Sequence, residues 1–274
     1  MRKTATYIRN QKSKTPLVCL TAYTAPIAQL CDSHCDMILV GDSLSMVLYG
    51  EESTQGATLE MMARHGRAVV KASKKSLIIV DMPFGSYEEN KEEALKNAQY
   101  LLKETGAQAI KLEGGESLTT TIQYLTENSI SVVGHIGLLP QSVNSPDGFK
   151  IQGRDLDTAK QLMKDAKAVE EAGAFCFVIE AVPENLAAAI TASVSVPTIG
   201  IGASAACDGQ ILVSEDMLGL SVGRKPKFVK QYTQCEEIIS HAIADYAEDV
   251  KNRSFPEEKH TYKGQSAQKQ DKAA

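Results

Sequence analysis

Residues 77–113 read LIIVDMPFGSYEENKEEALKNAQYLLKETGAQAIKLE, and this stretch indicates how the chain is built. A short aliphatic run at 77–80 is followed by a helix-patterned segment at 88–105, and a second aliphatic run follows at 109–112. Two short strands separated by a helix are typical of a βαβ unit, in which the strands run parallel. The stretch therefore favours an α/β fold with a parallel sheet.

The same alternation continues along the rest of the chain. We predict strands at 17–21, 37–40, 77–80, 109–112, 130–133, 175–179 and 197–201, and a weaker one at 218–222. We predict helices at 24–35, 58–74, 88–105, 116–128, 155–172, 183–192, 208–217 and 231–250. This alternation predicts a (β/α)8 TIM barrel that forms one catalytic domain over residues 1–256. Residues 257–274 are polar, and we predict that they form a disordered C-terminal tail.

The net charge of the chain limits the kinds of molecule that we expect it to bind. The chain has 274 residues, with 29 Lys and Arg against 34 Asp and Glu, so its formal net charge is −5. This balance argues against binding to nucleic acid or to an anionic membrane, because either would need a basic face. No apolar run approaches the ~20 residues of a membrane span, and residues 1–10 lack the apolar centre of a secretory signal. We therefore expect a cytoplasmic protein with reduced cysteines and a small-molecule partner.

Cys31, His34 and Cys35 are spaced closely enough to suggest a zinc site. Zinc sites usually draw on two paired ligand clusters, however, and no second pair follows at the usual distance. The apolar periodicity of residues 25–35 favours an ordinary amphipathic helix instead.

Ionisable residues close five consecutive predicted strands. They are Asp42, Asp81, Lys111 with Glu113, His135, and Glu180. Any one of them alone could be a turn former or part of a structural ion pair. The carboxyl ends of barrel strands converge on one mouth, however, and unpaired charge there would cost several kcal/mol. Two long connections, 41–58 and 136–154, follow strands at the same mouth. We therefore predict an active site there.

The chemistry of these side chains favours a divalent metal. Three carboxylates with one lysine leave surplus negative charge, which a bound cation would neutralise. Oxygen ligands from Asp42, Asp81 and Glu113 suit Mg²⁺ better than zinc, since His135 would be the only nitrogen ligand. A metal held in this way can chelate a 2-oxo acid and stabilise its enolate.

The remaining charged residues have candidate roles in such a reaction. Glu180, on a strand opposite the metal ligands, is the candidate base, and Lys111 would hold the substrate carboxylate or the enolate oxygen. His135 would hydrogen-bond the substrate or the second reactant. The alternative for His135 is a structural contact with the 136–154 loop.

Short strings in collinear order, from about residue 15 to residue 256, resemble the ketopantoate hydroxymethyltransferase family. The strings are LTAY (20–23), VGDSL (40–44), DMPF (81–84), KLEGG (111–115), GHIGLLPQSVN (134–144), KIQGR (150–154), GIGA (200–203), DGQILV (208–213) and PKF (226–228).

The resemblance implies a (β/α)8 barrel with 3-methyl-2-oxobutanoate hydroxymethyltransferase activity. It implies one Mg²⁺ per subunit, 5,10-methylenetetrahydrofolate as the one-carbon donor, and 2-dehydropantoate as the product. This reaction is the first committed step of pantothenate and coenzyme A synthesis. The resemblance also implies a large homo-oligomer, typically a homodecamer.

By motif, the resemblance also implies roles for individual residues. Asp42 and Asp81 match metal ligands that contact the substrate, and Glu113 matches a direct or water-mediated metal ligand. Ser43 and Lys111 match substrate contacts. Glu180, by the same comparison, matches the proton acceptor.

Two other classes of protein remain open. A barrel of the phosphoenolpyruvate mutase and isocitrate lyase type would use the same carboxylate-bound Mg²⁺, and in a metal-free variant Lys111 would form a Schiff base. A barrel that has lost catalysis would act as a binding protein.

Overall fold

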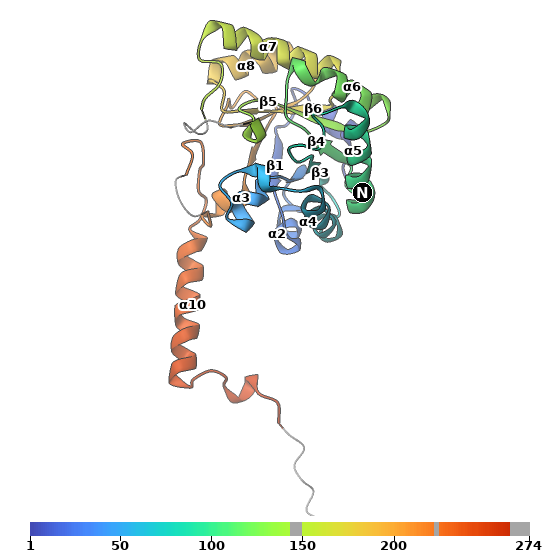
Figure 1. The fold of residues 1–274 in the computed structure, drawn as a ribbon. Helices are drawn as coiled ribbons and strands as arrows, with labels where there is room; N and C mark the ends of the chain where they lie inside the picture. The colour runs from blue at the N-terminus through green and yellow to red at the C-terminus, as the bar shows by residue number, and fades with distance from the viewer. Residues whose placement is uncertain (143–149, 222–224, 264–274) are drawn as a thin grey trace, which may run out of the picture.

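Eight parallel strands close on themselves in the computed structural model, which describes residues 1–142, 150–221 and 225–263 (Figure 1). The strands are β1 (Leu17–Thr21), β2 (Met37–Val40), β3 (Leu77–Asp81), β4 (Ala109–Lys111), β5 (Val132–Gly137), β6 (Cys176–Glu180), β7 (Thr198–Ile201) and β8 (Gly209–Leu212). Each strand pairs with the next, and β8 closes the ring on β1 with Gly209 opposite Leu17. The predicted (β/α)8 barrel is confirmed.

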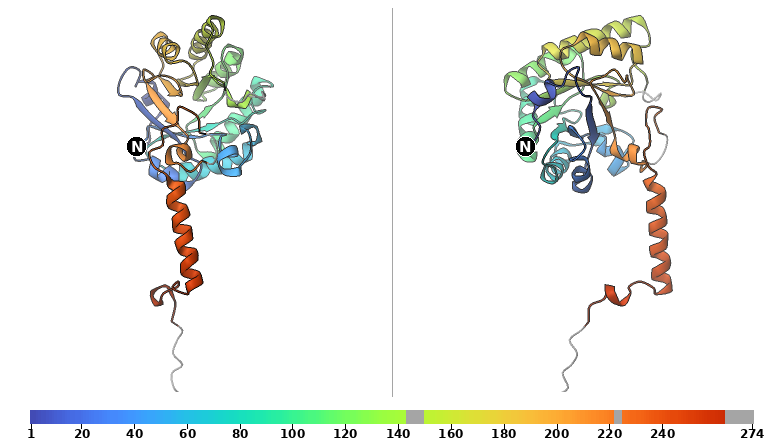
Figure 2. Two further views of the ribbon diagram at one scale, coloured as in Figure 1. Left: turned by 90° about the vertical axis from the view of Figure 1, so that its left-hand side faces the viewer. Right: turned by 180° about the vertical axis from the view of Figure 1, so that it is seen from behind.

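Helices cover the outside of the barrel and connect its strands (Figures 1 and 2). The α-helices are α1 (Ala5–Arg9), α2 (Ala25–Cys31), α3 (Leu44–Tyr49), α4 (Leu59–Ala72), α5 (Lys91–Thr105), α6 (Thr119–Glu127), α7 (Leu156–Glu171), α8 (Glu184–Ser193), α9 (Ser214–Leu218) and α10 (Cys235–Asn252). Short 3-10 helices lie at η1 (Thr54–Gly56), η2 (Glu116–Leu118), η3 (Pro140–Ser142) and η4 (Glu258–His260).

Side-chain caps mark where the longer helices begin. Thr58 accepts a hydrogen bond from Met61 N at the start of α4, and Asn90 accepts one from Glu93 N at the start of α5. These bonds satisfy backbone donors that have no partner within the helix. The caps fix the points at which the chain leaves the carboxyl-end loops and turns back along the barrel.

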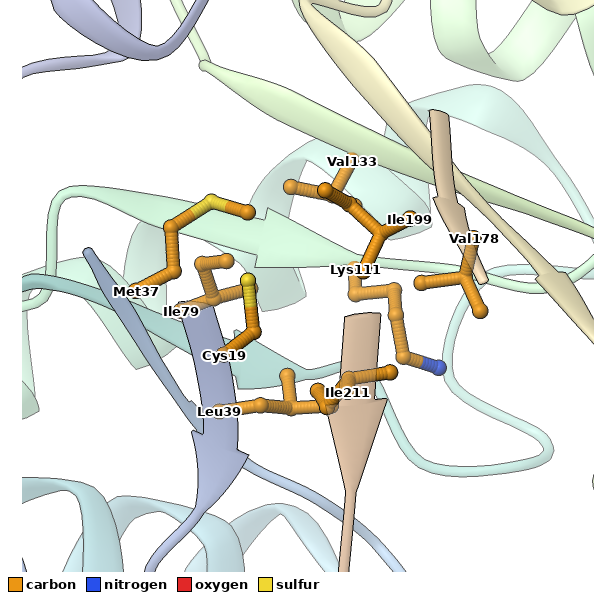
Figure 3. A pocket seen from close by; sticks show the side chains of 9 residues that line it. All are labelled: Cys19, Met37, Leu39, Ile79, Lys111, Val133, Val178, Ile199 and Ile211. Atoms are coloured by element: carbon orange, nitrogen blue, oxygen red, sulfur yellow. The ribbon is translucent and has the colours of Figure 1, made fainter. Parts of the chain in front are cut away.

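The inward-facing side chains of the strands are apolar in the interior of the barrel and polar at its carboxyl-end mouth. Apolar side chains fill the interior, and a small apolar cavity lies among them beside the stem of Lys111 (Figure 3). The lining residues are Cys19, Met37, Leu39, Ile79, Lys111, Val133, Val178, Ile199 and Ile211. Helix α1, which the pattern did not predict, adds the fully buried Ile8 to the same cluster. The interior is therefore packed, and polar chemistry is confined to the carboxyl-end mouth.

The eighth βα unit differs from its prediction. The predicted strand at 218–222 and helix at 208–217 are wrong, because β8 is Gly209–Leu212 and α9 follows it directly. Residues 218–221 end α9 and lead into a connection, and residue 222 lies outside the described part of the chain. The backbone of Asp208 accepts a hydrogen bond from Leu17 N at 2.8 Å, which starts the pairing of β8 with β1. Periodicity cannot distinguish so short an apolar run from a helical turn.

Helix α10 occupies the sequence position of the predicted eighth helix but projects away from the barrel in every view (Figures 1 and 2). None of its 18 residues, all of which the structure describes, is buried. Large apolar side chains along it are exposed at Ile238, Ile239, Ile243, Tyr246 and Val250.

Two further predictions concern the C-terminal tail and membrane spans. Residues 264–274, most of the predicted disordered tail, lie outside the described residues. Within the described ranges, no helix is both long enough and apolar enough to cross a membrane.

Candidate active site

The predicted site residues meet at the carboxyl-end mouth of the barrel. Side chains alternate along a strand, so Asp81 shares the inward face with Ile79, and Lys111 shares it with Ala109. Glu180 ends β6 on the same side as Val178. The last inward-facing residue of each of these strands is ionisable, whereas the preceding one is apolar.

Lys111 lies at the centre of the charged cluster. Its Nζ is 3.1 Å from Asp81 Oδ1, 3.6 Å from Glu113 Oε1 and 3.3 Å from His135 Nδ1. Only its aliphatic stem contacts the apolar interior (Figure 3). Lys111 therefore acts as a buried counter-ion for Asp81 on the neighbouring strand β3 and for Glu113 in the loop after its own strand.

His135 links two carboxylates on opposite sides of its ring. Nδ1 is 3.3 Å from Glu113 Oε1, and Nε2 is 3.3 Å from Glu180 Oε2. The side chain of Glu180 is 15 % exposed, compared with 2 % for that of Glu113. Of the two carboxylates, Glu180 is therefore the more open to the mouth.

Asp42 completes the cluster from the loop after β2. Its backbone N donates to Asp81 Oδ2 at 3.1 Å, and its own Oδ2 accepts a hydrogen bond from Gln141 Nε2 at 2.8 Å. A Cβ at Gly41 would lie 2.8 Å from Ser43 Oγ, so a larger residue there would displace the Ser43 side chain. Ser43 Oγ is hydrogen-bonded to Tyr23 Oη at 2.8 Å.

Burial and neighbouring charges raise the pKa of two of these carboxylates and lower the pKa of the third. Burial, followed by repulsion from Asp81 and Glu113, raises the pKa of Asp42 well above its ordinary value. Burial also raises the pKa of Asp81, although Lys111 opposes that shift. Burial would raise the pKa of Glu113 as well, but the charges of His135 and Lys111 outweigh it and the pKa is lowered.

The two basic groups are held in their charged forms. Burial opposes protonation of Lys111, but Asp81 and Glu113 outweigh it and raise the pKa of Lys111 above its ordinary value. Burial and the charge of Lys111 likewise oppose protonation of His135. Its contacts with Glu113 and Glu180 outweigh them and raise its pKa to about 9. The surrounding acidic side chains therefore favour the ammonium form of Lys111 and the imidazolium form of His135.

A model of the family described as ketopantoate hydroxymethyltransferase matches residues 2–258. The chain belongs to this family. It is 54% identical over 261 residues to the 3-methyl-2-oxobutanoate hydroxymethyltransferase of Rhizobium rhizogenes, covering 95% of this chain and 96% of that protein. It is also 54% identical over 266 residues to the enzyme of the same name from a Ruegeria species, covering 97% and 95% of the two chains. The predicted family and the assignment to the hydroxymethyltransferase class of enzymes are confirmed.

Solved structures share the barrel of this ketopantoate hydroxymethyltransferase family member at low sequence identity. A putative phosphonomutase from Burkholderia cenocepacia aligns with a TM-score of 0.66 at 13% identity, covering 89% of this chain and 100% of that one. A phosphoenolpyruvate phosphomutase from Streptomyces platensis aligns with a TM-score of 0.61 at 10% identity, covering 91% and 88%. At these identities the likeness concerns the fold alone.

Two further residues of the candidate site were not predicted from the sequence of this ketopantoate hydroxymethyltransferase family member. Gln141 bonds Asp42 directly, and Tyr87 bonds Gln141. The long 136–154 connection and the string GHIGLLPQSVN (134–144) both include Gln141, but neither distinguishes it from its neighbours. Tyr87 carried no signal, because a neutral aromatic residue in a loop has no diagnostic spacing.

Proposed function

We propose that the chain transfers a hydroxymethyl group from 5,10-methylenetetrahydrofolate to 3-methyl-2-oxobutanoate, giving 2-dehydropantoate. The observation that carries the proposal is the cluster of Asp42, Asp81 and Glu113 around Lys111, with Glu180 on the far side of His135. The curated relatives named for this reaction support it, since they match nearly the full chain. The reaction would begin pantothenate and coenzyme A synthesis.

Asp42, Asp81 and Glu113 are the residues that would hold Mg²⁺. Their donor set is all oxygen, which suits a hard cation. The buried Asp81 Oδ1 is paired with Lys111 Nζ at 3.1 Å, and burial followed by repulsion from Asp81 and Glu113 raises the pKa of Asp42, so a bound cation would relieve the repulsion among the three carboxylates. The described His, Cys, Asp and Glu side chains include no group of three already converged as metal ligands, so the carboxylates would have to close around the ion. The bound metal would supply polarisation of the substrate carbonyl.

Lys111 and Ser43 would bind substrate oxygens. The ammonium of Lys111 is fixed at the centre of the mouth, where it can neutralise charge on the oxygen of the reacting 2-oxo acid. The Ser43 hydroxyl is half-buried beside Tyr23 and lies next to Asp42 in the sequence. Both side chains are held by polar contacts with neighbouring residues.

Glu180 would accept the proton from C3 of the 2-oxo acid. Its contact with His135 orients the carboxylate while leaving it partly exposed to the mouth. C3 would then attack the methylene carbon of the folate as one of that carbon's two bonds to nitrogen breaks. Water would displace the second nitrogen, which leaves the hydroxymethyl group on C3 and releases tetrahydrofolate. His135 would hold Glu180 in place through its Nε2, while its Nδ1 faces Glu113.

The Schiff-base alternative is disfavoured by the charge state of Lys111. A nucleophilic lysine needs a free amine, whereas the carboxylates beside Lys111 raise its pKa and keep it protonated. Borohydride treatment with 3-methyl-2-oxobutanoate should leave the mass of the protein unchanged. A reduced adduct on Lys111 would instead support the metal-free alternative.

We also propose that the protein forms a homo-oligomer, with the homodecamer as the expected size. Helix α10 supports this, because its exposed apolar side chains have no packing partner on their own barrel among the described residues. The outward-facing Val18 of β1 is 48% exposed, so the barrel wall beside β8 offers apolar surface. Helix α10 of a second copy would cover such surface. A cytoplasmic location stays a prediction.

Product formation tests the proposed reaction. The purified chain should convert 3-methyl-2-oxobutanoate and 5,10-methylenetetrahydrofolate to 2-dehydropantoate only when Mg²⁺ is present. Phosphonopyruvate and isocitrate, offered under the same conditions, should give no product. Turnover of either of these and not of 3-methyl-2-oxobutanoate would favour the mutase and lyase alternative, and no turnover of any of them would favour a binding protein.

A further inference from the structure

Every polar group of Gln141 is engaged in the mouth of the barrel. Its Nε2 donates to Asp42 Oδ2 at 2.8 Å and to the Met82 carbonyl at 2.9 Å, and its backbone N donates to Glu113 Oε2 at 3.0 Å. Its backbone carbonyl accepts from Gln55 Nε2 at 2.8 Å. The residue is 1% exposed. One uncharged residue therefore joins the loops that follow β2, β3, β4 and β5, through its side chain and its backbone.

Tyr87 fixes which way the Gln141 amide points. The Tyr87 hydroxyl donates to Gln141 Oε1 and accepts from Glu113 N, which lies 3.2 Å away. With Oε1 held by a donor, the NH₂ end must face Asp42 and the Met82 carbonyl, both of which are acceptors. The reversed amide would place an oxygen against those two acceptors and leave buried groups unpaired.

The arrangement connects two of the carboxylates that we assign to the metal. Asp42 is bonded by the side chain of Gln141, and Glu113 is bonded by its backbone. Groups that bond metal ligands from outside the coordination shell orient those ligands and tune their affinity.

We propose that Gln141 is a positioning residue that holds Asp42 and Glu113 in place for a divalent cation, with Tyr87 setting its amide orientation. The inference rests on the proposed function, because it assigns the cation to these carboxylates. Gln141 itself contacts neither the ion nor the substrate in this account. It limits how far the carboxylates move when they close around the ion.

Two substitutions remove different numbers of these hydrogen bonds. Gln141→Leu keeps the side-chain volume and both backbone bonds but loses all side-chain bonds, so we expect Mg²⁺ to bind about 10–100-fold more weakly. Tyr87→Phe removes one hydroxyl and should give a smaller loss in the same direction. Mg²⁺ needs a stricter geometry than Ca²⁺, so the ratio of Mg²⁺ to Ca²⁺ affinity should also fall in both variants.

Calorimetric titration of the full chain with MgCl₂ and then CaCl₂, at a fixed concentration of 3-methyl-2-oxobutanoate, measures both quantities. Thr105→Val is the matched control, because the Thr105 hydroxyl is also buried and donates to Leu101 O, but at the far end of α5. It should lower stability without changing either affinity. A merely structural role for Gln141 would make Gln141→Leu behave like this control.

The outcomes separate this inference from the proposed function. If Asp81→Asn abolishes Mg²⁺ binding while Gln141→Leu and Tyr87→Phe leave affinity and selectivity within twofold of the unaltered chain, the positioning role is overturned and the metal site stands. If the unaltered chain binds no Mg²⁺, the metal site itself is wrong and the inference with it. Should Gln141→Leu fail to fold, Tyr87→Phe decides the result.

Discussion

Lys111 and Asp81 are direct neighbours across β4 and β3, and their side chains form a buried ion pair with 3.1 Å between Nζ and Oδ1. The pair sits where the apolar interior of the barrel ends and the charged mouth begins. The ammonium of Lys111 neutralises the charge of Asp81 within the protein. Further carboxylates remain around the pair, so the site still favours a bound cation.

Lys111→Met should destabilise the metal-free protein strongly. Removing one partner leaves Asp81 and Glu113 buried with less compensation, which typically costs about 3–5 kcal/mol. Urea unfolding in the presence of EDTA measures the loss. Added Mg²⁺ should restore part of the lost free energy of unfolding, and a variant as stable as the unaltered chain in EDTA would show that the pair is not a structural counter-ion.

Asp42→Asn should have opposite effects on stability and on metal binding. Because the folded pKa of Asp42 is raised, its ionised form costs stability at neutral pH, and that cost disappears when the charge is removed. We expect the metal-free variant to gain about 1 kcal/mol in the free energy of unfolding. The same variant should lose the stabilisation that Mg²⁺ gives the unaltered chain. Thermal melts with EDTA and with Mg²⁺ measure both effects, and an Asp42→Asn protein that Mg²⁺ still stabilises would remove Asp42 from the ligand set.

Asp208 provides a test of pH dependence away from the mouth. Burial would raise its pKa, but bonds from Lys12 Nζ, Thr198 N and Ser13 N outweigh burial and hold the pKa below its usual range. A depressed carboxylate pKa contributes stability above the unfolded value of about 4, and this contribution is lost as the pH falls through the folded pKa. Asp208→Asn should therefore be less stable at pH 7 by about 1–3 kcal/mol. The difference from the unaltered chain should shrink by pH 3, and a constant difference in urea unfolding at both pH values would contradict the assignment.

The sequence predicted the charged part of the site better than its neutral part. Alternation along each strand and convergence at a barrel mouth are enough to bring together Asp81, Lys111 and Glu180, although their chemical roles remain predictions. Gln141 lies in the short helix η3 and Tyr87 in a loop, and both act through hydrogen bonds, which depend on the conformation of the connections and leave no periodic pattern.

Two parts of the fold could also not be predicted from the apolar periodicity of the sequence. The strand β8 is too short for its period to be distinguished from a helical turn. For α10, the apolar stripe predicts a helix correctly, but a stripe does not say which surface covers it.

The exposed face of α10 gives a prediction about assembly. Ile239→Asp with Ile243→Asp should dissociate the oligomer, because charge would be placed in the surface that we propose is buried between copies. Asp245→Asn, on the same helix and exposed, is the control and should leave the assembly unchanged. Sedimentation velocity measures the mass. A monomeric unaltered chain, or an assembly that survives the double variant, would contradict the proposed role of α10.

The central claim is that Glu180 accepts the proton from C3 of the 2-oxo acid. Exchange of the C3 proton of 3-methyl-2-oxobutanoate with deuterium oxide, followed by NMR with Mg²⁺ and without folate, isolates this step. Glu180→Gln should slow exchange by ~10²–10⁴ while substrate still binds, since the amide cannot act as a base. Glu184→Gln, the same change at an exposed position at the start of α8, should exchange at the rate of the unaltered chain. Undiminished exchange in Glu180→Gln at full substrate occupancy would contradict the account.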